Sequence, residues 1–91
     1  MTAISSVIVE FFGIPRERAG RSELAATAGS LASVLMAVQE ECPRLSDLRQ
    51  AHGGISPHYR ISLDGQRFLT DVEEILPAGS HVLILSADAG G

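Results

Sequence analysis

Four consecutive apolar residues near the end of the chain, Val82-Leu83-Ile84-Leu85, place the strongest constraint on the fold. A strand that is apolar on both faces is typical of a central position in a sheet. Residues 6–12 also have strand character, because Val7, Val9 and Phe11 alternate with residues that point to the opposite face. The sequence therefore predicts a sheet with strand 81–85 at its centre, beside strand 6–12.

One main helix is predicted between these strands. Ser30 is a suitable N-cap, and Pro43 cannot continue a helix. Apolar residues recur between them at the spacing of one helix face: Leu31, Val34, Leu35, Val38 and Cys42.

The other segments predict short elements. Residues 59–63 alternate as a strand, and Asp64-Gly65 is a strong signal for a two-residue hairpin turn to a return strand over 66–69. Residues 21–27 are predicted as a second strand that pairs with the first. Three further segments are predicted as turns: a polar turn over 15–20, and helical turns over 46–51 and 72–76.

This order of elements predicts an α+β fold, with a mixed four- to five-stranded sheet packed on one main helix. Ninety-one residues make one domain. We expect that domain to span residues 1–85, followed by a flexible tail over 86–91.

Composition argues against several classes of function. The net charge is −4, and the seven basic residues are all Arg and lie scattered among acids, so nucleic acid is not an expected partner. One cysteine, Cys42, excludes an internal disulfide. No export signal and no apolar stretch of about twenty residues is present, so we expect a cytoplasmic protein without a membrane span.

No residue pattern predicts an active site. His52, His58 and His81 share no ligand spacing and have no cysteine pair beside them, so no metal site is expected. The acidic run Asp71, Glu73 and Glu74 is typical of a solvated turn. Arg16 and Arg18 are interpreted in the same way, with contact to acidic residues of a partner protein as the alternative. We expect a protein that is not itself an enzyme.

A single helix covers only one face of a sheet. The other face then exposes an apolar surface, formed by Ile8, Phe12, Leu83 and Leu85 or by the residues that alternate with them, and such a surface is typical of a protein-binding site. The expected partner surface consists of Phe12, Leu83, Leu85 and Arg16. The alternative is that the loop over 44–58 covers this face.

The chain ends in Gly90-Gly91 after small residues that include Ala89. Two glycines form a thin strip of backbone that can enter a narrow tunnel, where a Cβ would clash. Six extended residues from Ser86 reach about 20 Å, enough to place the terminal carboxylate of Gly91 inside another protein's active site. The alternative is an ordinary frayed terminus.

Three segments, taken together, resemble the MoaD/ThiS family of ubiquitin-like, β-grasp sulfur carriers over almost the whole chain. The first, residues 11–20, follows the pattern FFA-x-x-RE-x-x-G with Gly13 in place of alanine. The second is the turn Leu63-Asp64-Gly65. The third runs from Leu76 through Gly79 into the final strand and the terminal Gly-Gly. The first segment and the chain length favour the MoaD branch, the small subunit of molybdopterin synthase.

The resemblance implies a β-grasp fold and a sulfur carrier. An ATP-dependent adenylyltransferase of the MoeB/ThiF kind would adenylate Gly91, and sulfur would then be held as a C-terminal thiocarboxylate. The acceptor would be an enzyme such as the MoaE-like large subunit of molybdopterin synthase. No bound cofactor is implied, because ATP is used by the activating enzyme.

Two departures from the family pattern leave other partners open. Ser80-His81 replaces the usual acidic pair, and residues 86–89 replace a proline-rich stretch. One alternative is a ThiS-like carrier or a carrier for another pathway. A second is a ubiquitin-like modifier that forms isopeptide bonds, and a third is an interaction module with a dispensable tail.

Overall fold

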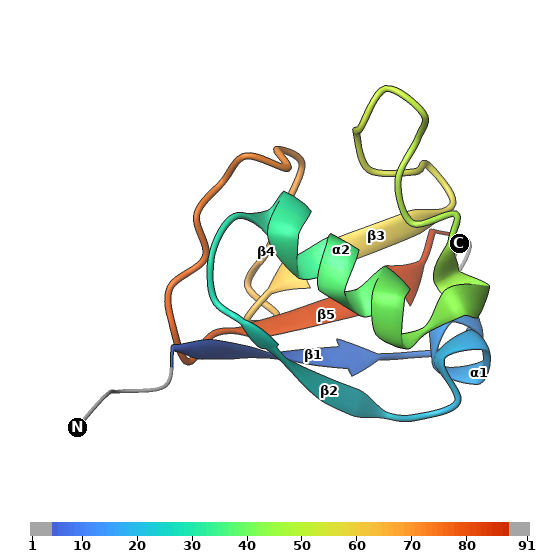
Figure 1. The fold of residues 1–91 in the computed structure, drawn as a ribbon, viewed down its shortest axis with the longest axis horizontal. Helices are drawn as coiled ribbons and strands as arrows, with labels where there is room; N and C mark the ends of the chain where they lie inside the picture. Colours follow the sequence, from blue (N-terminus) through green and yellow to red (C-terminus); the bar gives the residue numbers. More distant parts are fainter. Residues whose placement is uncertain (1–4, 88–91) are drawn as a thin grey trace.

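The computed structural model describes residues 5–87, which form one five-stranded sheet crossed on one face by a helix (Figure 1). The strand order is β2-β1-β5-β3-β4. The strands are β1 (Ser6–Phe11), β2 (Glu23–Thr27), β3 (Tyr59–Leu63), β4 (Arg67–Phe68) and β5 (His81–Ser86). The helices are α1 (Ile14–Ala19), α2 (Leu31–Glu41) and the 3-10 turn η1 (Pro43–Leu45).

Strand β5 lies at the centre of the sheet, as its apolar sequence predicts. It pairs in parallel with β1 and antiparallel with β3. The register sets Val9 beside Val82 and Phe11 beside Ile84, so apolar side chains of both strands share one face. The predicted α+β sheet with one main helix is confirmed.

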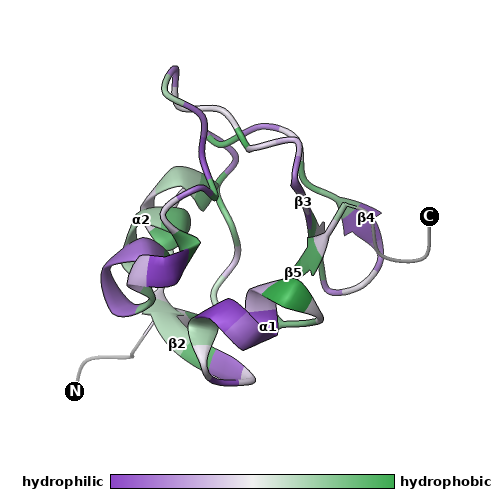
Figure 2. Cartoon of the chain, turned by 90° about the vertical axis from the view of Figure 1, so that its right-hand side faces the viewer, coloured by the Kyte–Doolittle hydropathy of each residue, from purple (hydrophilic) through white to green (hydrophobic). Residues whose placement is uncertain are grey.

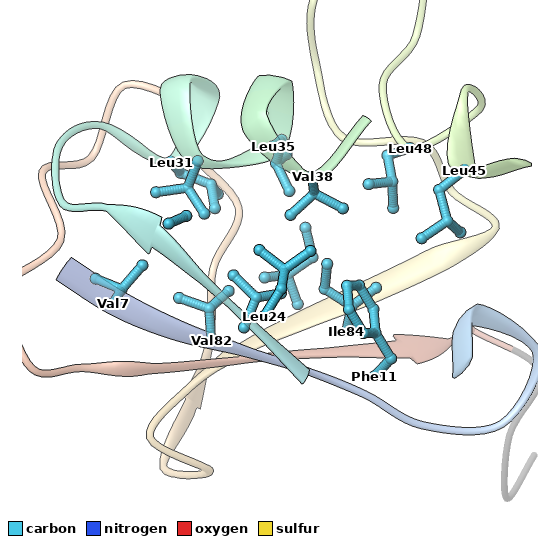
Figure 3. Close-up of a cluster of buried hydrophobic side chains, with 14 of the residues drawn as sticks. Val7, Phe11, Leu24, Leu31, Leu35, Val38, Leu45, Leu48, Val82 and Ile84 are labelled. Carbon is cyan, nitrogen blue, oxygen red and sulfur yellow. The ribbon is translucent and has the colours of Figure 1, made fainter. Parts of the chain in front are cut away.

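The core fills the space between the sheet and α2 (Figure 3). Val7, Val9, Val82 and Ile84 are all fully buried on the helix side of the sheet. They face the buried stripe of α2, which contains Leu31, Val34, Leu35 and Val38 as its spacing predicts. The Ser30 hydroxyl accepts a hydrogen bond from the Ser33 amide (3.1 Å), which confirms Ser30 as the N-cap of α2.

Helix α1 corrects the prediction of a polar turn over 15–20. Pro15, the first residue of that predicted turn, occupies the first turn of a six-residue helix, where its missing N–H is not needed. Gly20 ends that helix in the left-handed conformation (φ 72°), and its amide donates to the Arg16 carbonyl. Figure 2 looks onto this end of the molecule and shows α1 closest to the viewer and largely hydrophilic.

The segments 46–51 and 72–76 do not form the predicted helical turns. Each begins with a hydrogen bond of the i→i+3 kind, from the Leu48 amide to the Leu45 carbonyl and from the Glu74 amide to the Asp71 carbonyl, and other backbone groups of each segment bond elsewhere. In the first, Arg49 forms an antiparallel bridge with Ile55. In the second, the Glu74 and Val72 carbonyls accept from the amides of Leu31 and Ala32 (2.8 and 2.7 Å). These bonds satisfy two donors that the first turn of any α-helix leaves unpaired.

A hairpin joins β3 to β4 as predicted, with Asp64 and Gly65 both at positive φ (56° and 70°), as a type I′ turn requires. The register pairs Leu63 with Arg67, so three residues rather than the predicted two lie between the paired positions. Strand β4 is shorter than the predicted 66–69. Strand β1 ends at Phe11, one residue earlier than predicted, and β2 begins at Glu23 rather than residue 21.

Candidate functional site

The tail leaves the sheet from its central strand. Strand β5 continues to Ser86, one residue further than predicted, and the Ala87 amide donates to the His58 carbonyl (2.9 Å). Ala89, Gly90 and Gly91, the predicted tail residues, lie outside the described residues. The structure therefore defines the base of the tail, at the end of the sheet where α1 and η1 lie (Figure 1).

The apolar residues of the expected partner surface lie on the sheet face opposite α2. The Phe12 amide donates to the Ile84 carbonyl (3.1 Å), which sets Phe12 beside Leu85. Phe12 is 42% exposed, and Leu83 and Leu85 are half-buried. These three residues form one continuous group that ends next to the base of the tail; we call it the apolar patch.

The apolar patch extends toward the edge of the sheet. Leu85 pairs with Arg60 in the register of β5 and β3, and the Arg60 guanidinium lies 5.0 Å from the centre of the Phe68 ring. Phe68 is 53% exposed. A hollow of about 420 Å³ adjoins these two residues between β4 and the loop before β3. Neither Arg60 nor Phe68 was predicted as part of the surface, because their contact depends on the β3–β4 register.

The loop over 44–58 does not cover this face. Its fully buried residues, Leu45 and Leu48, belong to the core on the α2 side of the sheet (Figure 3). The apolar patch consequently remains open in the described part of the chain, with Phe12 as its most exposed member.

Arg16 does not lie on the sheet face. It belongs to α1 and is exposed, at the end of the molecule from which the tail leaves. The structure thus places Phe12, Leu83 and Leu85 together, and sets Arg16 on a neighbouring element near the base of the tail.

Arg18, Asp47 and Tyr59 form a hydrogen-bonded triangle that sequence reasoning missed. Arg18 Nη1 donates to the Tyr59 hydroxyl (2.6 Å) and to Asp47 Oδ2 (3.1 Å), and the Tyr59 hydroxyl donates to Asp47 Oδ1 (2.6 Å). The three residues are separated by 12 to 41 positions, so no local pattern could reveal them. Arg18, interpreted as part of a solvated turn, contacts an acid of its own chain.

The triangle shifts the pKa values of its members. Burial and the hydrogen bond to Asp47 raise the pKa of Tyr59. For Asp47, burial acts in the opposite direction, but hydrogen bonds from Tyr59 and the backbone, with the Arg18 charge, lower its pKa overall. Asp47 is therefore ionised and Tyr59 neutral at pH 7, the states that this arrangement of donors and acceptors requires.

Other charged residues make surface ion pairs. Glu74, from the acidic run, pairs with Arg67, and the hydrogen bond from Arg67 lowers the pKa of Glu74. His81 Nδ1 lies 2.6 Å from Glu10 Oε2 on the outer sheet face. Cys42 is buried at the end of α2, and burial raises the pKa of its thiol, as expected for a structural cysteine rather than a nucleophile.

Within residues 5–87, no group of three or more His, Cys, Asp or Glu side chains is arranged to hold a metal ion. None of the helices in this part of the chain is long and apolar enough to cross a membrane.

Comparison with known proteins shows what the fold resembles. No protein-family model and no curated protein matches the chain. Small archaeal modifier protein 1 from Haloferax volcanii superposes with a TM-score of 0.79 at 20% identity, covering 94% of this chain and 99% of that one. Small archaeal modifier protein 1 from Methanosarcina acetivorans gives 0.79 at 23% identity, covering 99% and 100%.

A third structure is named as a putative molybdopterin converting factor, subunit 1, from Pyrococcus furiosus. It superposes with a TM-score of 0.73 at 17% identity and covers 90% of this chain and 97% of that one. The agreement extends over nearly the full length of each chain, so it includes both the five-stranded sheet and the helix described above. The chain has the β-grasp, ubiquitin-like fold.

Proposed function

We propose that this protein is a sulfur carrier of the MoaD/ThiS kind, which works through the carboxylate of Gly91. The observation that carries the proposal is the course of the last strand. Strand β5 is held at the centre of the sheet by β1 and β3, its pairing continues to Ala87, and the sequence then ends in Gly90-Gly91. A rigid domain thus supports a short, slender chain end that an enzyme's tunnel can admit.

The proposed chemistry takes place on a partner. Attack of the Gly91 carboxylate on the α-phosphate of ATP gives an acyl-adenylate and releases pyrophosphate. A sulfide-equivalent nucleophile then displaces AMP and leaves a thiocarboxylate, which an acceptor enzyme uses as its sulfur source. In this proposal the protein contributes the reacting carboxylate and the docking surface, and the partners contribute the catalytic residues.

The apolar patch is the proposed docking surface for the adenylyltransferase and the acceptor. Phe12 and Leu85 lie next to the base of the tail, so an enzyme bound there would receive the tail within the roughly 20 Å that six extended residues can span. Arg16, on α1, is placed to meet an acidic residue at the rim of such an interface. The putative molybdopterin converting factor among the similar structures favours a MoaE-like acceptor in molybdopterin synthesis.

The direct test is the mass of the intact protein after incubation with ATP, the co-encoded adenylyltransferase and a sulfur donor. The expected product is heavier by one sulfur less one oxygen, and the gain maps to Gly91. The matched control lacks Gly90 and Gly91 and should gain no mass while unfolding at the same temperature. An unchanged mass for the full chain would contradict the proposal.

A second function, a protein modifier, is favoured by two of the similar structures, which are small archaeal modifier proteins. Here an amine of a target protein attacks the activated Gly91 and forms an amide. Conjugates in cell extract would then survive reducing agent and disappear when Gly91 is removed. Because the 91 residues contain no lysine, the expected conjugates carry one copy on each target lysine rather than chains linked through lysine.

A further inference from the structure

The last residue pairs that hold β5 in the sheet are formed with the beginning of β3. Tyr59 pairs with Ser86, and the Ala87 amide donates to the carbonyl of His58, the residue before β3. Strand β1 does not extend this far, because its register with β5 stops at Phe11 and Ile84. The last residues of β5 therefore pair with the His58–Tyr59 segment.

That segment is fixed by the Arg18–Asp47–Tyr59 triangle. The ring of Tyr59 belongs to the core and is 5% exposed, while its hydroxyl reaches the surface and contacts both charged partners. Arg18 comes from α1 and Asp47 from the segment after η1. Three chain segments that are distant in sequence thus meet through one hydroxyl group.

The triangle also lies at the base of the tail. Arg18, Asp47 and Tyr59 line a hollow of about 190 Å³, and Ile14, His58 and Ser86 complete its lining. The residue that ends β5 and the residues that hold the start of β3 therefore belong to one local structure.

We propose that Arg18, Asp47 and Tyr59 are positioning residues that keep Ser86 and Ala87 paired with β3, and so fix where the tail begins and in which direction it leaves. Without the Tyr59 hydroxyl, the last pairs of the ladder open more often. The free chain end then lengthens, and a partner must order more residues when it binds the tail. This role in positioning rests on the proposed carrier function, whereas the effect on the ladder does not.

The first test is amide hydrogen exchange, measured by NMR on the full chain with the variant Tyr59→Phe. This change removes only the hydroxyl and keeps the buried ring. We expect the Ala87 amide to exchange about three- to tenfold faster, the effect of losing one hydrogen-bonding group. The Leu83 amide, deeper in the same strand, should be unchanged.

The matched control is Arg67→Gln, which removes a surface ion pair with Glu74 at the opposite end of the sheet. It should leave Ala87 exchange at the wild-type rate. Equal Ala87 protection in Tyr59→Phe and wild type would overturn the proposal, and so would an equal loss in the Arg67 variant. If Tyr59→Phe fails to fold, Asp47→Asn changes an exposed member of the same triangle, and Ala87 exchange is measured in that variant instead.

The second test separates positioning from stability. With ATP and the co-encoded adenylyltransferase, Tyr59→Phe should raise the KM for this protein about three- to tenfold and leave kcat unchanged, since the reacting group is intact. Faster Ala87 exchange with an unchanged KM would overturn the positioning role. If wild type is not activated at all, the carrier function fails, and the exchange result still decides whether the triangle holds the ladder.

Discussion

The two faces of the sheet differ in how they are covered, although the same strands build both. On the α2 side, Val9, Val82 and Ile84 are completely buried. On the other side, Leu83 and Leu85 alternate with these residues along β5 but remain half-buried, beside a Phe12 that is 42% exposed. The inner face therefore accounts for stability, and the outer face retains apolar area that binding to another protein can bury.

The largest expected effect is on the inner face. Ile84→Ala removes a fully buried side chain from the central strand and leaves a cavity. We expect the free energy of unfolding to fall by about 2–5 kcal/mol. Urea denaturation followed by circular dichroism measures this, and a loss below about 1 kcal/mol would contradict the assignment of this face as the core.

The neighbouring outer residue should behave differently. Leu85→Ala is expected to cost about 1 kcal/mol of unfolding free energy, because the side chain is only half-buried. The rate of sulfur loading by the adenylyltransferase should nevertheless fall about tenfold, as for a residue at the centre of an interface. Thr27→Ala, exposed at the sheet edge, is the control and should change neither quantity. If Leu85→Ala is loaded with sulfur at the wild-type rate, the apolar patch is not the docking surface.

A smaller effect is expected where the outer face meets the sheet edge. Arg60 and Phe68 should be coupled by about 0.5 kcal/mol, typical of an exposed cation–π pair. A double-mutant cycle with Arg60→Ala, Phe68→Ala and the double variant measures this coupling in urea denaturation. If the losses of unfolding free energy in the two single variants add up to the loss in the double variant, the contact between Arg60 and Phe68 does not stabilise the sheet edge.

The smallest effect concerns the end of the sheet and depends on pH. The pKa of Asp47 is below its ordinary value of 3.8, so its charge stabilises the fold above that pH. This contribution is lost as the pH falls through the lowered pKa. Asp47→Asn should therefore lower the free energy of unfolding by about 0.5 kcal/mol at pH 7. The value is small because solvent screens the half-exposed pair of Asp47 and Arg18. At pH 3 the loss should be smaller.

The measurement is the free energy of unfolding of Asp47→Asn and wild type at both pH values. If the two proteins differ in unfolding free energy by the same amount at pH 7 and pH 3, the ionised carboxylate of Asp47 does not stabilise the fold.

Sequence patterns predicted those parts of the fold that depend on neighbouring residues. Alternation in β1, the apolar stripe of α2 and the Asp64-Gly65 turn each have a local cause, and all are confirmed. Helix α1 was missed because six residues give too little periodicity, and the polar segment 15–20 that starts with Pro15 is typical of a turn. The 72–76 segment was misassigned because its carbonyls bind the amides at the start of α2, forty residues earlier in the chain.

The candidate site also has one part that the sequence predicted and one part that it did not. The apolar patch follows from the alternation in β1 and β5, so the sequence predicted that Phe12, Leu83 and Leu85 share a face. The Arg18–Asp47–Tyr59 triangle depends on how α1, the segment after η1 and β3 come together. The chemistry proposed for Gly91 stays a prediction, carried by the sequence alone.

The parallel pairing of β1 and β5 has a practical consequence for work on this protein. Ser6, where β1 begins, and Ser86, where β5 ends, lie at opposite ends of the sheet, roughly 20 Å apart along the strand direction. An affinity tag, fluorophore or surface linker joined ahead of β1 should leave the region around the tail accessible to a partner. The same addition joined after Gly91 would cap the carboxylate that is proposed to react.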